Sequence, residues 1–295
     1  MAKLFLQGCG TALVTPFKDG AVDYDAYASL IDRQVAAGVD FLVPLATTGE
    51  TPTLSREEKV ALMNITREHA KGLPLVVGCG TNSFTGTIDN IRLLENLGVD
   101  AFLVVVPYYN KPTQEGQYSY FKAVAAQTDK PIVIYNVPGR TGANMSADTC
   151  IRLANDCPNI IATKEASGNY SQINEIIRRA PQGFSVLSGD DELTLPIIAS
   201  GGHGVISVAS NIAPKQVAEL CAALLRSDME SARKLHHSLC PLFKNCFVES
   251  NPIPAKSAMA RLGLLRNELR LPLVSSSEKT DAIMDQTLRD LGLLN

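Results

Sequence analysis

Short apolar runs alternate with amphipathic helical patterns along most of the chain. Eight runs read as strands, and they begin near residues 11, 41, 75, 101, 131, 160, 185 and 204. Most of these starts lie roughly 25–33 residues apart, which is the period of a (β/α)8 barrel. The runs are nearly continuous in apolar residues, as expected of strands covered on both faces. The pattern therefore predicts an α/β fold, a TIM barrel of parallel strands.

Signals for helix ends support this alternation. Asp23 is a plausible N-cap, and Ser55–Glu58 has the spacing of a capping box. Residues 37–43 resemble residues 97–103 in a weak internal repeat. In each repeat we expect a helix to end at a glycine, because glycine adopts the left-handed conformation at little cost.

The last part of the chain follows a different pattern. From about Asp228 to Asn295 only helical periodicity is visible, broken by the proline-containing stretches 251–254 and 270–273. We therefore predict a barrel over residues 1–227 and a helical C-terminal domain over residues 228–295. For this extension we expect a role as scaffold or oligomer surface.

Composition narrows the class of protein. The 295 residues are 45% hydrophobic and 19% charged, which is typical of a globular protein. The net charge is -3, no cluster of Lys and Arg occurs, and tryptophan is absent, so nucleic acid is not an expected partner. No apolar run reaches the ~18 residues needed to span a membrane, and the apolar start is too short for a signal peptide. We expect a cytoplasmic protein.

The cysteines and histidines do not form a recognisable metal or disulfide pattern. Seven cysteines are scattered without a CxxC pair, and four histidines lie far apart in the sequence. Free thiols fit a reducing compartment. The glycines lack the spacing of a dinucleotide-binding fingerprint. Neither a metal nor a nicotinamide cofactor is expected.

The most informative residue is Lys164, which lies in the apolar run 160–167. Lysine is rarely fully buried, because removing an ammonium group from water is costly. One explanation is chemical, since burial of a lysine favours the neutral amine that forms a Schiff base with a carbonyl. The alternatives are an ion pair with Glu165 or a side chain that reaches solvent.

Other polar residues follow the predicted strands. The active site of a (β/α)8 barrel lies at the C-terminal ends of its strands. The residues at those ends are Thr15–Phe17, Thr47–Glu50, Pro107–Asn110, Tyr135–Gly142, Lys164–Ser167, Ser188–Asp191 and Ile206–Ser207. Hydroxyls, phenols, one amine and one guanidinium are therefore expected at one mouth. This set suits Schiff-base chemistry, in which hydroxyls carry protons and an arginine binds a carboxylate.

Each residue also has a simpler structural explanation. Tyr135 could be an aromatic of the sheet whose hydroxyl bonds to the backbone. Thr47 and Thr48 could serve only to form a turn, and Arg140 could form a surface ion pair. Tyr108 and Tyr109 could be core or interface aromatics. Their common location at strand ends favours the chemical explanation.

At this point the motifs resemble those of the dihydrodipicolinate synthase family, also called 4-hydroxy-tetrahydrodipicolinate synthases. The resemblance covers nearly the whole chain and rests on residues 10–17, 47–50, 107–112, 135–142, 164–168, 188–191, 202–207 and 251–256. Thr47–Glu50 and the lysine motif alone would indicate only the wider superfamily of pyruvate-dependent class I aldolases. The stretch Tyr135–Gly142, with its arginine, is similar to the synthase branch.

The resemblance implies a role for each site residue. Lys164 would form the imine with pyruvate, and Tyr135 would be the central proton donor and acceptor. Thr47 and Tyr109 would complete a proton relay, with Tyr109 reaching in from a neighbouring subunit. The substrate-binding residues would be Thr48, Ile206, Arg140 and Gly189.

The resemblance also implies an activity. Such an enzyme is a lyase that condenses pyruvate with L-aspartate-4-semialdehyde in lysine and diaminopimelate biosynthesis. It is typically a homotetramer, a dimer of dimers, and requires no organic cofactor or metal. One alternative is an N-acetylneuraminate lyase-like or 2-keto-3-deoxy sugar acid aldolase, against which Arg140 argues. Another is a non-catalytic barrel that senses a keto acid.

One departure from the family concerns inhibition by lysine. Inhibited members place histidines and a glutamate around a pocket at a dimer interface. The corresponding positions here are Arg56, Lys59 and Gly86, while Asn82 and Tyr108 remain. Added positive charge and a missing carboxylate weaken binding of a cationic amino acid. We expect weak or absent inhibition by lysine.

Overall fold

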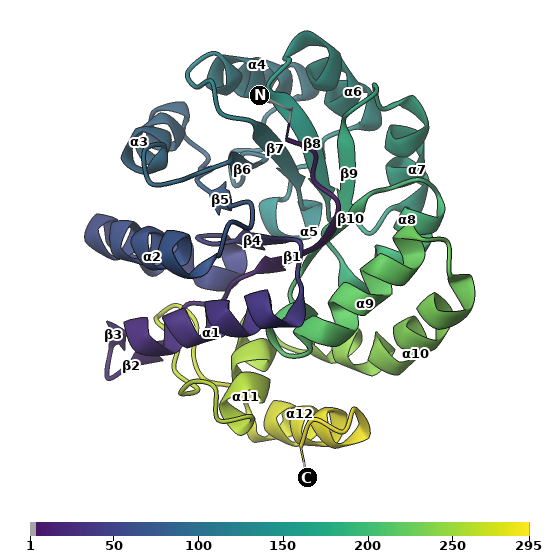
Figure 1. Cartoon of the computed structure of the whole chain (residues 1–295). Coiled ribbons are helices and arrows are strands. Elements are labelled where there is room, and N and C mark those ends of the chain that lie inside the picture. Colours follow the sequence, from purple (N-terminus) through teal and green to yellow (C-terminus); the bar gives the residue numbers. More distant parts are fainter. Residues whose placement is uncertain (1–3, 295) are drawn as a thin grey trace.

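The computed structural model describes residues 4–294 and contains an eight-stranded parallel sheet in the order β4-β1-β10-β9-β8-β7-β6-β5 (Figure 1). A parallel bridge between Leu42 and Leu75 links the two outermost strands, so the sheet returns on itself as a barrel. The strands are β1 (Gly8–Ala12), β4 (Phe41–Val43), β5 (Val76–Gly78), β6 (Ala101–Val105), β7 (Ile132–Asn136), β8 (Ile160–Glu165), β9 (Ser185–Ser188) and β10 (Gly204–Ser207). The predicted α/β barrel is confirmed.

Eight helices follow the eight strands and surround them in Figure 1. They are α1 (Tyr24–Ala37), α2 (Arg56–His69), α3 (Phe84–Leu94), α4 (Gln114–Ala125), α6 (Ala147–Asp156), α7 (Tyr170–Arg179), α8 (Thr194–Ala199) and α9 (Pro214–Leu225). The predicted caps are present, because Asp23 accepts from the backbone of Ala26 and Ser55 and Glu58 form the reciprocal bonds of a capping box. Gly38 ends α1 in the left-handed conformation. The glycine of the second repeat, Gly98, is also left-handed but lies past the end of α3.

The first strand begins earlier than predicted, at Gly8 rather than near Thr11. Its glycines and cysteine carry little strand propensity, so the apolar pattern missed them. Pairing with β10 decides the start, since Gly8 lies opposite Gly204 and donates to the carbonyl of His203. A side chain at Gly204 would meet the carbonyl oxygen of Gly8 at 2.1 Å, so this pair of strands requires glycine there. A short hairpin, β2 (Phe17–Lys18) and β3 (Ala21–Val22), follows β1 and was not predicted.

The apolar strands separate two buried clusters. The larger cluster lies between the strands and the outer helices, and a smaller one fills the barrel interior. Tyr135 and Ile206 belong to the interior cluster together with Ala162. Because side chains alternate across a strand, Lys164, two residues after Ala162, points to the same interior side. This alternation brings the lysine to the mouth of the barrel.

The C-terminal part is mainly helical, with α10 (Met229–Asn245), α11 (Ile253–Arg261) and α12 (Glu278–Asp290) beside the barrel in Figure 1. Residues 262–277 contain no helix, so the break predicted at residues 270–273 is wider than expected. Arg270 fixes this stretch, because its guanidinium bonds to Glu58 and to the carbonyl of Thr53. The division into domains at residues 227 and 228 stays a prediction.

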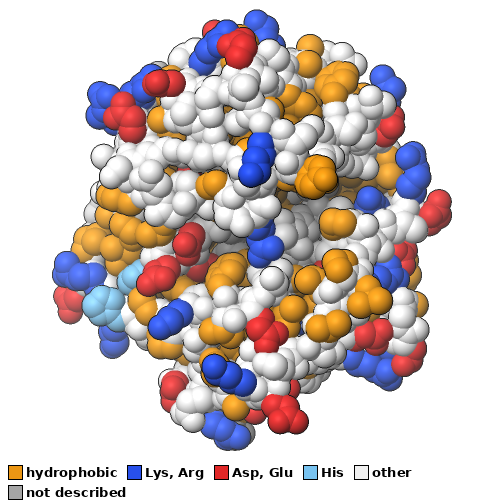
Figure 2. Space-filling model, turned by 180° about the vertical axis from the view of Figure 1, so that it is seen from behind, with side chains coloured by type: hydrophobic (Ala, Val, Ile, Leu, Met, Phe, Trp, Pro, Cys, Tyr) orange, Lys and Arg blue, Asp and Glu red, His pale blue; other side chains and the backbone are white. Residues whose placement is uncertain are grey.

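The surface carries charge of both signs. On the face in Figure 2, acidic and basic side chains are interspersed, and a hollow lies near the middle. Among residues 4–294, no helix is long and apolar enough to cross a bilayer.

Candidate active site

Lys164 lies at the end of β8 beside Tyr135, its register partner on β7. The lysine is 5% exposed, and its Nζ lies 4.2 Å from the centroid of the Tyr135 ring. Within residues 4–294 its Nζ has no hydrogen bond to protein and no ion pair. In this described range, the face of the Tyr135 ring is the one electrostatic contact made by Nζ. The proposed ion pair with Glu165 is not formed.

Glu165 points away from Lys164 and anchors the neighbouring loop. Its carboxylate accepts hydrogen bonds from Asn136 and from Ser167, each at 2.6 Å. Burial raises the pKa of Glu165, and these hydrogen bonds oppose the shift. Asn136 in turn accepts from the backbone of Met145 at 3.0 Å. The network fixes the ends of β7 and β8, and with them the positions of Tyr135 and Lys164.

A cavity of about 320 Å³ opens in front of the lysine. Its lining comes from several strand ends and from the C-terminal extension: Thr47, Thr48, Tyr135, Val137, Arg140, Lys164, Ala166, Gly189, Asp190, Glu192, Val208, Phe243, Lys244, Phe247 and Asn251. Six of the eight predicted site residues therefore meet around one space. Ile206 and Tyr109 do not line it.

The turn after β4 supplies the two threonines. Residues Thr47–Gly49 form a single 3₁₀ turn, in which Gly49 donates to the carbonyl of Ala46 at 3.0 Å. Thr15, which follows β1, closes the turn by donating to the carbonyl of Gly49 at 2.8 Å. Thr48 is buried, whereas Thr47 is half-buried and its hydroxyl has no protein partner among the described residues. The threonines thus form a turn and also offer hydroxyls to the cavity.

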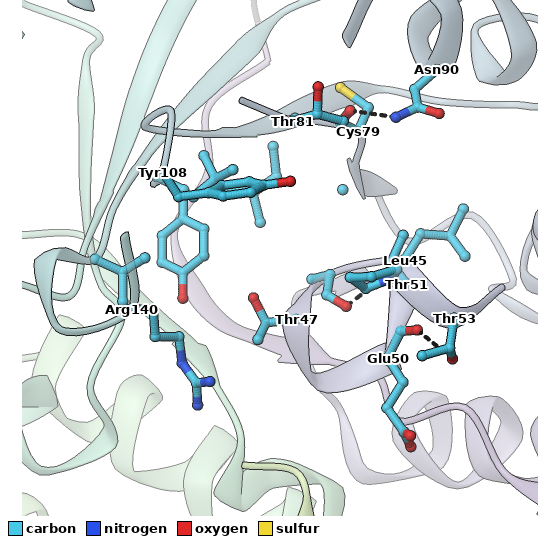
Figure 3. A pocket seen from close by; sticks show the side chains of 18 of the residues that line it. Leu45, Thr47, Glu50, Thr51, Thr53, Cys79, Thr81, Asn90, Tyr108 and Arg140 are labelled. Atoms are coloured by element: carbon cyan, nitrogen blue, oxygen red, sulfur yellow. Dashed lines mark hydrogen bonds between the residues drawn. The ribbon is translucent and has the colours of Figure 1, made fainter. Parts of the chain in front are cut away.

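The simpler explanations for Tyr135 and Arg140, a hydrogen bond to the backbone and a surface ion pair, are not observed among residues 4–294. The hydroxyl of Tyr135 makes no hydrogen bond within residues 4–294, although the residue is buried. Arg140 lies in α5 (Pro138–Thr141), is exposed, and its guanidinium has no ion pair in that same range. Arg140 and Thr47 face the same space in Figure 3. The hydroxyl of Tyr135 and the guanidinium of Arg140 are therefore available to contact a ligand.

Gly189 leaves room for the lysine. A Cβ atom at this position would lie 2.6 Å from the Cβ of Ala166 and 3.1 Å from the Cε of Lys164. Its backbone N–H donates to the carbonyl of Glu165 at 2.7 Å, which holds β9 against β8. Any larger residue would clash with Ala166 and crowd the lysine stem.

Two predicted residues lie elsewhere within this chain. Ile206 is buried in the barrel interior, in the same apolar cluster as Tyr135. Tyr109 is 86% exposed, and its backbone is left-handed with φ of 74°. The structure therefore does not bring Tyr109 to Lys164 of its own barrel.

A second cavity, of about 450 Å³, adjoins the first (Figure 3). The two share Thr47, Tyr135, Val137, Arg140 and Asn251. The larger one also reaches Lys59 and Tyr108, whereas Arg56 and Gly86 do not line it. Burial and the charge of Arg56 lower the pKa of Lys59.

Sequence reasoning missed two contacts between the C-terminal extension and the turn at Thr47–Glu50. Asn251 donates to Thr48 at 3.0 Å, and Lys256 forms an ion pair with Glu50 at 2.5 Å. Burial lowers the pKa of Lys256 to about 8, against the attraction of Glu50. The sequence signal that could have revealed these contacts is the presence of polar residues in the segment Asn251–Ser257, which the structure shows to be buried.

The described residues contain no group of three or more metal-ligating side chains, and all seven cysteines are free. A (β/α)8 barrel with an unpaired buried amine at its mouth, beside hydroxyls that make no hydrogen bond to the described residues, is typical of one class of enzyme. It is the arrangement of an enzyme that uses a lysine on a carbonyl substrate.

Comparison with known proteins agrees with this class. The model of the dihydrodipicolinate synthetase family matches residues 5–291. The chain is 47% identical to the 4-hydroxy-tetrahydrodipicolinate synthase of Thermotoga neapolitana over 292 residues, covering 98% of this chain and 99% of the relative. The chain belongs to the dihydrodipicolinate synthetase family.

Solved structures show the same fold. The crystal structure of dihydrodipicolinate synthase from Thermotoga maritima superposes with a TM-score of 0.97 at 46% identity, covering 99% of this chain and 100% of that one. A monomeric dihydrodipicolinate synthase variant superposes with a TM-score of 0.96 at 46% identity, with 98% of each chain covered.

Proposed function

We propose that this protein condenses pyruvate with L-aspartate-4-semialdehyde to give 4-hydroxy-tetrahydrodipicolinate, through an imine on Lys164. The proposal rests mainly on the buried, unpaired Nζ of Lys164 at the cavity, 4.2 Å from the ring centroid of Tyr135. A structural lysine at this depth would have a carboxylate partner. The high identity to named synthases over the full chain supports the same reaction. The enzyme is therefore a lyase of lysine and diaminopimelate biosynthesis.

The chemistry begins with attack of the neutral Lys164 amine on the C2 carbonyl of pyruvate. The resulting carbinolamine loses water when its hydroxyl is protonated, and an imine forms. Loss of a proton from C3 converts the imine to an enamine, which attacks the aldehyde carbon of the second substrate. The amino group of the product then adds to C2 and displaces Lys164 as the ring closes.

Each of these steps moves a proton, and two hydroxyls are available to carry it. Tyr135 and Thr47 both line the cavity, and neither hydroxyl is engaged elsewhere in residues 4–294. We assign Tyr135 as the central donor and acceptor and Thr47 as its relay partner. General acid–base groups of this kind contribute about 10²–10⁴-fold to a rate.

Two carboxylates must be held for the carbon–carbon bond to form. We assign Thr48 and the backbone of its turn to the carboxylate of pyruvate, with Gly189 at the cavity wall and Ile206 in the apolar barrel interior. Arg140 is assigned to the carboxylate of the semialdehyde, since a guanidinium fork matches a carboxylate in two parallel hydrogen bonds. Its free guanidinium at the cavity mouth supports this role.

We also propose that the active form is a homotetramer, a dimer of dimers, in the cytoplasm. Tyr109 would enter the site of a neighbouring subunit and complete the relay. The 86% exposure of this large aromatic side chain in a single chain supports a partner surface. The reaction needs no organic cofactor or metal, because the protonated imine on Lys164 accepts the electrons released when C3 loses its proton.

The test is pyruvate consumption by the purified protein with and without L-aspartate-4-semialdehyde. We expect consumption that depends on the semialdehyde and disappears in Lys164→Ala. Cleavage of N-acetylneuraminate or a 2-keto-3-deoxy sugar acid in its place would support the aldolase alternative. Absence of a borohydride-trapped pyruvyl adduct on the wild-type protein would favour a non-catalytic sensor.

We further propose that L-lysine inhibits this enzyme weakly or not at all. Lys59 lines the larger cavity, and Arg56 lies close enough to lower its pKa, so a cationic ligand meets positive charge there. Steady-state rates measured at lysine concentrations up to about 10 mM should change little, because like charges repel. Inhibition at sub-millimolar concentration would contradict this proposal.

A further inference from the structure

The C-terminal extension reaches the turn that holds Thr48. Asn251 follows α10 and precedes α11, lines both cavities and is 4% exposed. Its side-chain Nδ2 donates to Oγ1 of Thr48 at 3.0 Å. The Oδ1 of Asn251 is buried and has no hydrogen-bond partner among residues 4–294. Burying an amide oxygen without a hydrogen-bond partner lowers stability. The one side-chain bond that Asn251 does make, to Thr48, therefore points to a role for this amide at the site.

The direction of this bond determines what Thr48 offers to a ligand. A threonine hydroxyl has one proton to donate and lone pairs with which to accept. Since Nδ2 donates to Oγ1, the hydroxyl proton of Thr48 points elsewhere. Within the described part of the chain, this proton has no acceptor. Thr48 is therefore prepared as a donor at the wall of the lysine cavity.

A second contact holds the same turn from the same segment. Lys256 pairs with Glu50 at 2.5 Å and donates to the carbonyl of Glu268 at 2.8 Å, and both members of the ion pair are fully buried. The segment that carries Asn251 is thus attached to the turn two residues beyond Thr48. The position of the amide relative to the hydroxyl does not depend on one weak bond.

We propose that Asn251 is a positioning residue that polarises Thr48, so that its hydroxyl donates to the carboxylate of pyruvate. This inference rests on the proposed function of the site. It assigns to the C-terminal extension a part in substrate recognition, beyond the role of scaffold or oligomer surface expected from the sequence. Asn251 acts through Thr48 and does not touch the reacting atoms.

The most direct test replaces Asn251 by aspartate, which is nearly the same shape and reverses the polarity. A carboxylate cannot donate to Oγ1 and instead accepts the Thr48 proton, and it adds a negative charge beside the substrate carboxylate. We expect the pyruvate concentration that gives half-maximal borohydride trapping on Lys164 to rise about 10- to 100-fold. Asn251→Ala, which only removes the donor, should show a smaller rise of about 3- to 10-fold.

Ser250→Asp is the matched control for charge. It places a carboxylate one residue away, at an exposed position on the wall of the larger cavity, where residue 250 makes no hydrogen bond to Thr48. We expect at most about a 2- to 3-fold change, because an exposed charge is screened by solvent. The pH dependence adds a second readout. In Asn251→Asp, the half-saturating pyruvate concentration should fall toward that of Asn251→Ala as pH is lowered and the new carboxyl takes up a proton.

A double-mutant cycle tests whether Asn251 acts through Thr48. On a Thr48→Val background, Asn251→Ala should change pyruvate trapping less than about 2-fold, because the hydroxyl to be oriented is already gone. Equal effects of Asn251→Ala in both backgrounds would overturn the inference. Wild-type half-saturation in Asn251→Asp would also overturn it, because Thr48 would then be the donor to residue 251.

Failure of the inference and of the proposed function give different results. If the wild-type protein forms no pyruvyl adduct on Lys164 and consumes no pyruvate, both fail. If the wild type forms the adduct and the Asn251 variants match it, only the role of Asn251 fails. Thermal unfolding of each variant, measured in parallel, identifies any loss that comes from misfolding.

Discussion

Two buried lysines lie close to the turn at Thr47–Glu50, and their surroundings differ. Lys164 is 5% exposed and has no charged or hydrogen-bonding protein partner within residues 4–294. Lys256 is 0% exposed and is paired with Glu50 at 2.5 Å. The Nζ of each lies 4.2 Å from an aromatic ring centroid, that of Tyr135 for Lys164 and that of Phe17 for Lys256.

This comparison shows that burial alone does not identify a reactive lysine. A carboxylate partner keeps Lys256 in a structural role, and its neighbouring ring carries no hydroxyl. Lys164 has an open cavity in place of a carboxylate, and its neighbouring ring carries a free phenol. The position of a partner, rather than depth, separates a residue that reacts from one that supports the fold.

The largest expected effect is loss of activity in Lys164→Ala. The imine cannot form without the amine, so kcat should fall by roughly 10⁴-fold or more. Borohydride trapping of pyruvate should disappear in mass spectra, while the melting temperature stays near that of the wild type. If Lys164→Ala kept its turnover, Lys164 would not be the reactive lysine. If the variant lost its stability, Lys164 would have a structural role like that of Lys256.

The next effect concerns the ring beside each amine. Tyr135→Phe keeps the ring over Lys164 and removes the hydroxyl, so kcat should fall about 10²–10⁴-fold. The adduct should still form, but more slowly, in single-turnover trapping. Phe17→Tyr at the other lysine is the matched addition of a hydroxyl and should not create pyruvate trapping at Lys256. Turnover close to wild type in Tyr135→Phe would refute the proton-carrying role.

Lys256→Met should act on stability rather than on chemistry. It leaves the buried carboxylate of Glu50 without its ion-pair partner, although the backbone N–H of Arg270 still donates to it at 3.1 Å. Loss of the pair costs about 3–5 kcal/mol in free energy of unfolding. Adding Glu50→Leu should restore much of that loss, because a buried ion pair can be replaced by apolar groups. Urea denaturation measures both. A single variant as stable as the wild type would contradict the structural role.

The smallest expected effect is a pH dependence specific to Lys256. Its pKa is about 8 in the folded protein, below the ordinary value, because burial disfavours the charged form. The unfolded chain therefore binds more protons between pH 8 and about 10.4, so the free energy of unfolding should rise across that range. The contribution is lost as pH falls through 8. Lys256→Met, measured over the same range, should lack this component of the rise.

Much of the fold could be predicted from local patterns. The spacing of apolar runs predicts the eight strands, because parallel strands buried on both faces leave continuous apolar stretches. Asp23 and the pair Ser55 and Glu58 mark helix starts through contacts only three residues apart. Short-range bonds of this kind depend on the sequence alone. The start of β1 at Gly8 was missed, because only its pairing with β10 defines it.

The candidate site was predictable up to the strand ends. Parallel strands bring their C-terminal ends to one mouth, which places Lys164, Tyr135 and Arg140 together once the barrel is recognised. The sequence could not say whether Lys164 has a partner. Alternation along β8 turns Glu165 to the opposite side, where Asn136 and Ser167 bind it.

By itself, then, the sequence determined the barrel, the helix caps, the family motifs and the lysine that we expect to react. Only the tertiary structure decided which groups meet across long separations. Asn251 and Thr48 are 203 residues apart, and Lys256 and Glu50 are 206 apart. No local pattern encodes such pairs, because packing of the C-terminal helices against the barrel brings them within hydrogen-bonding distance. The register between β7 and β8 likewise decides that Lys164 lies beside Tyr135.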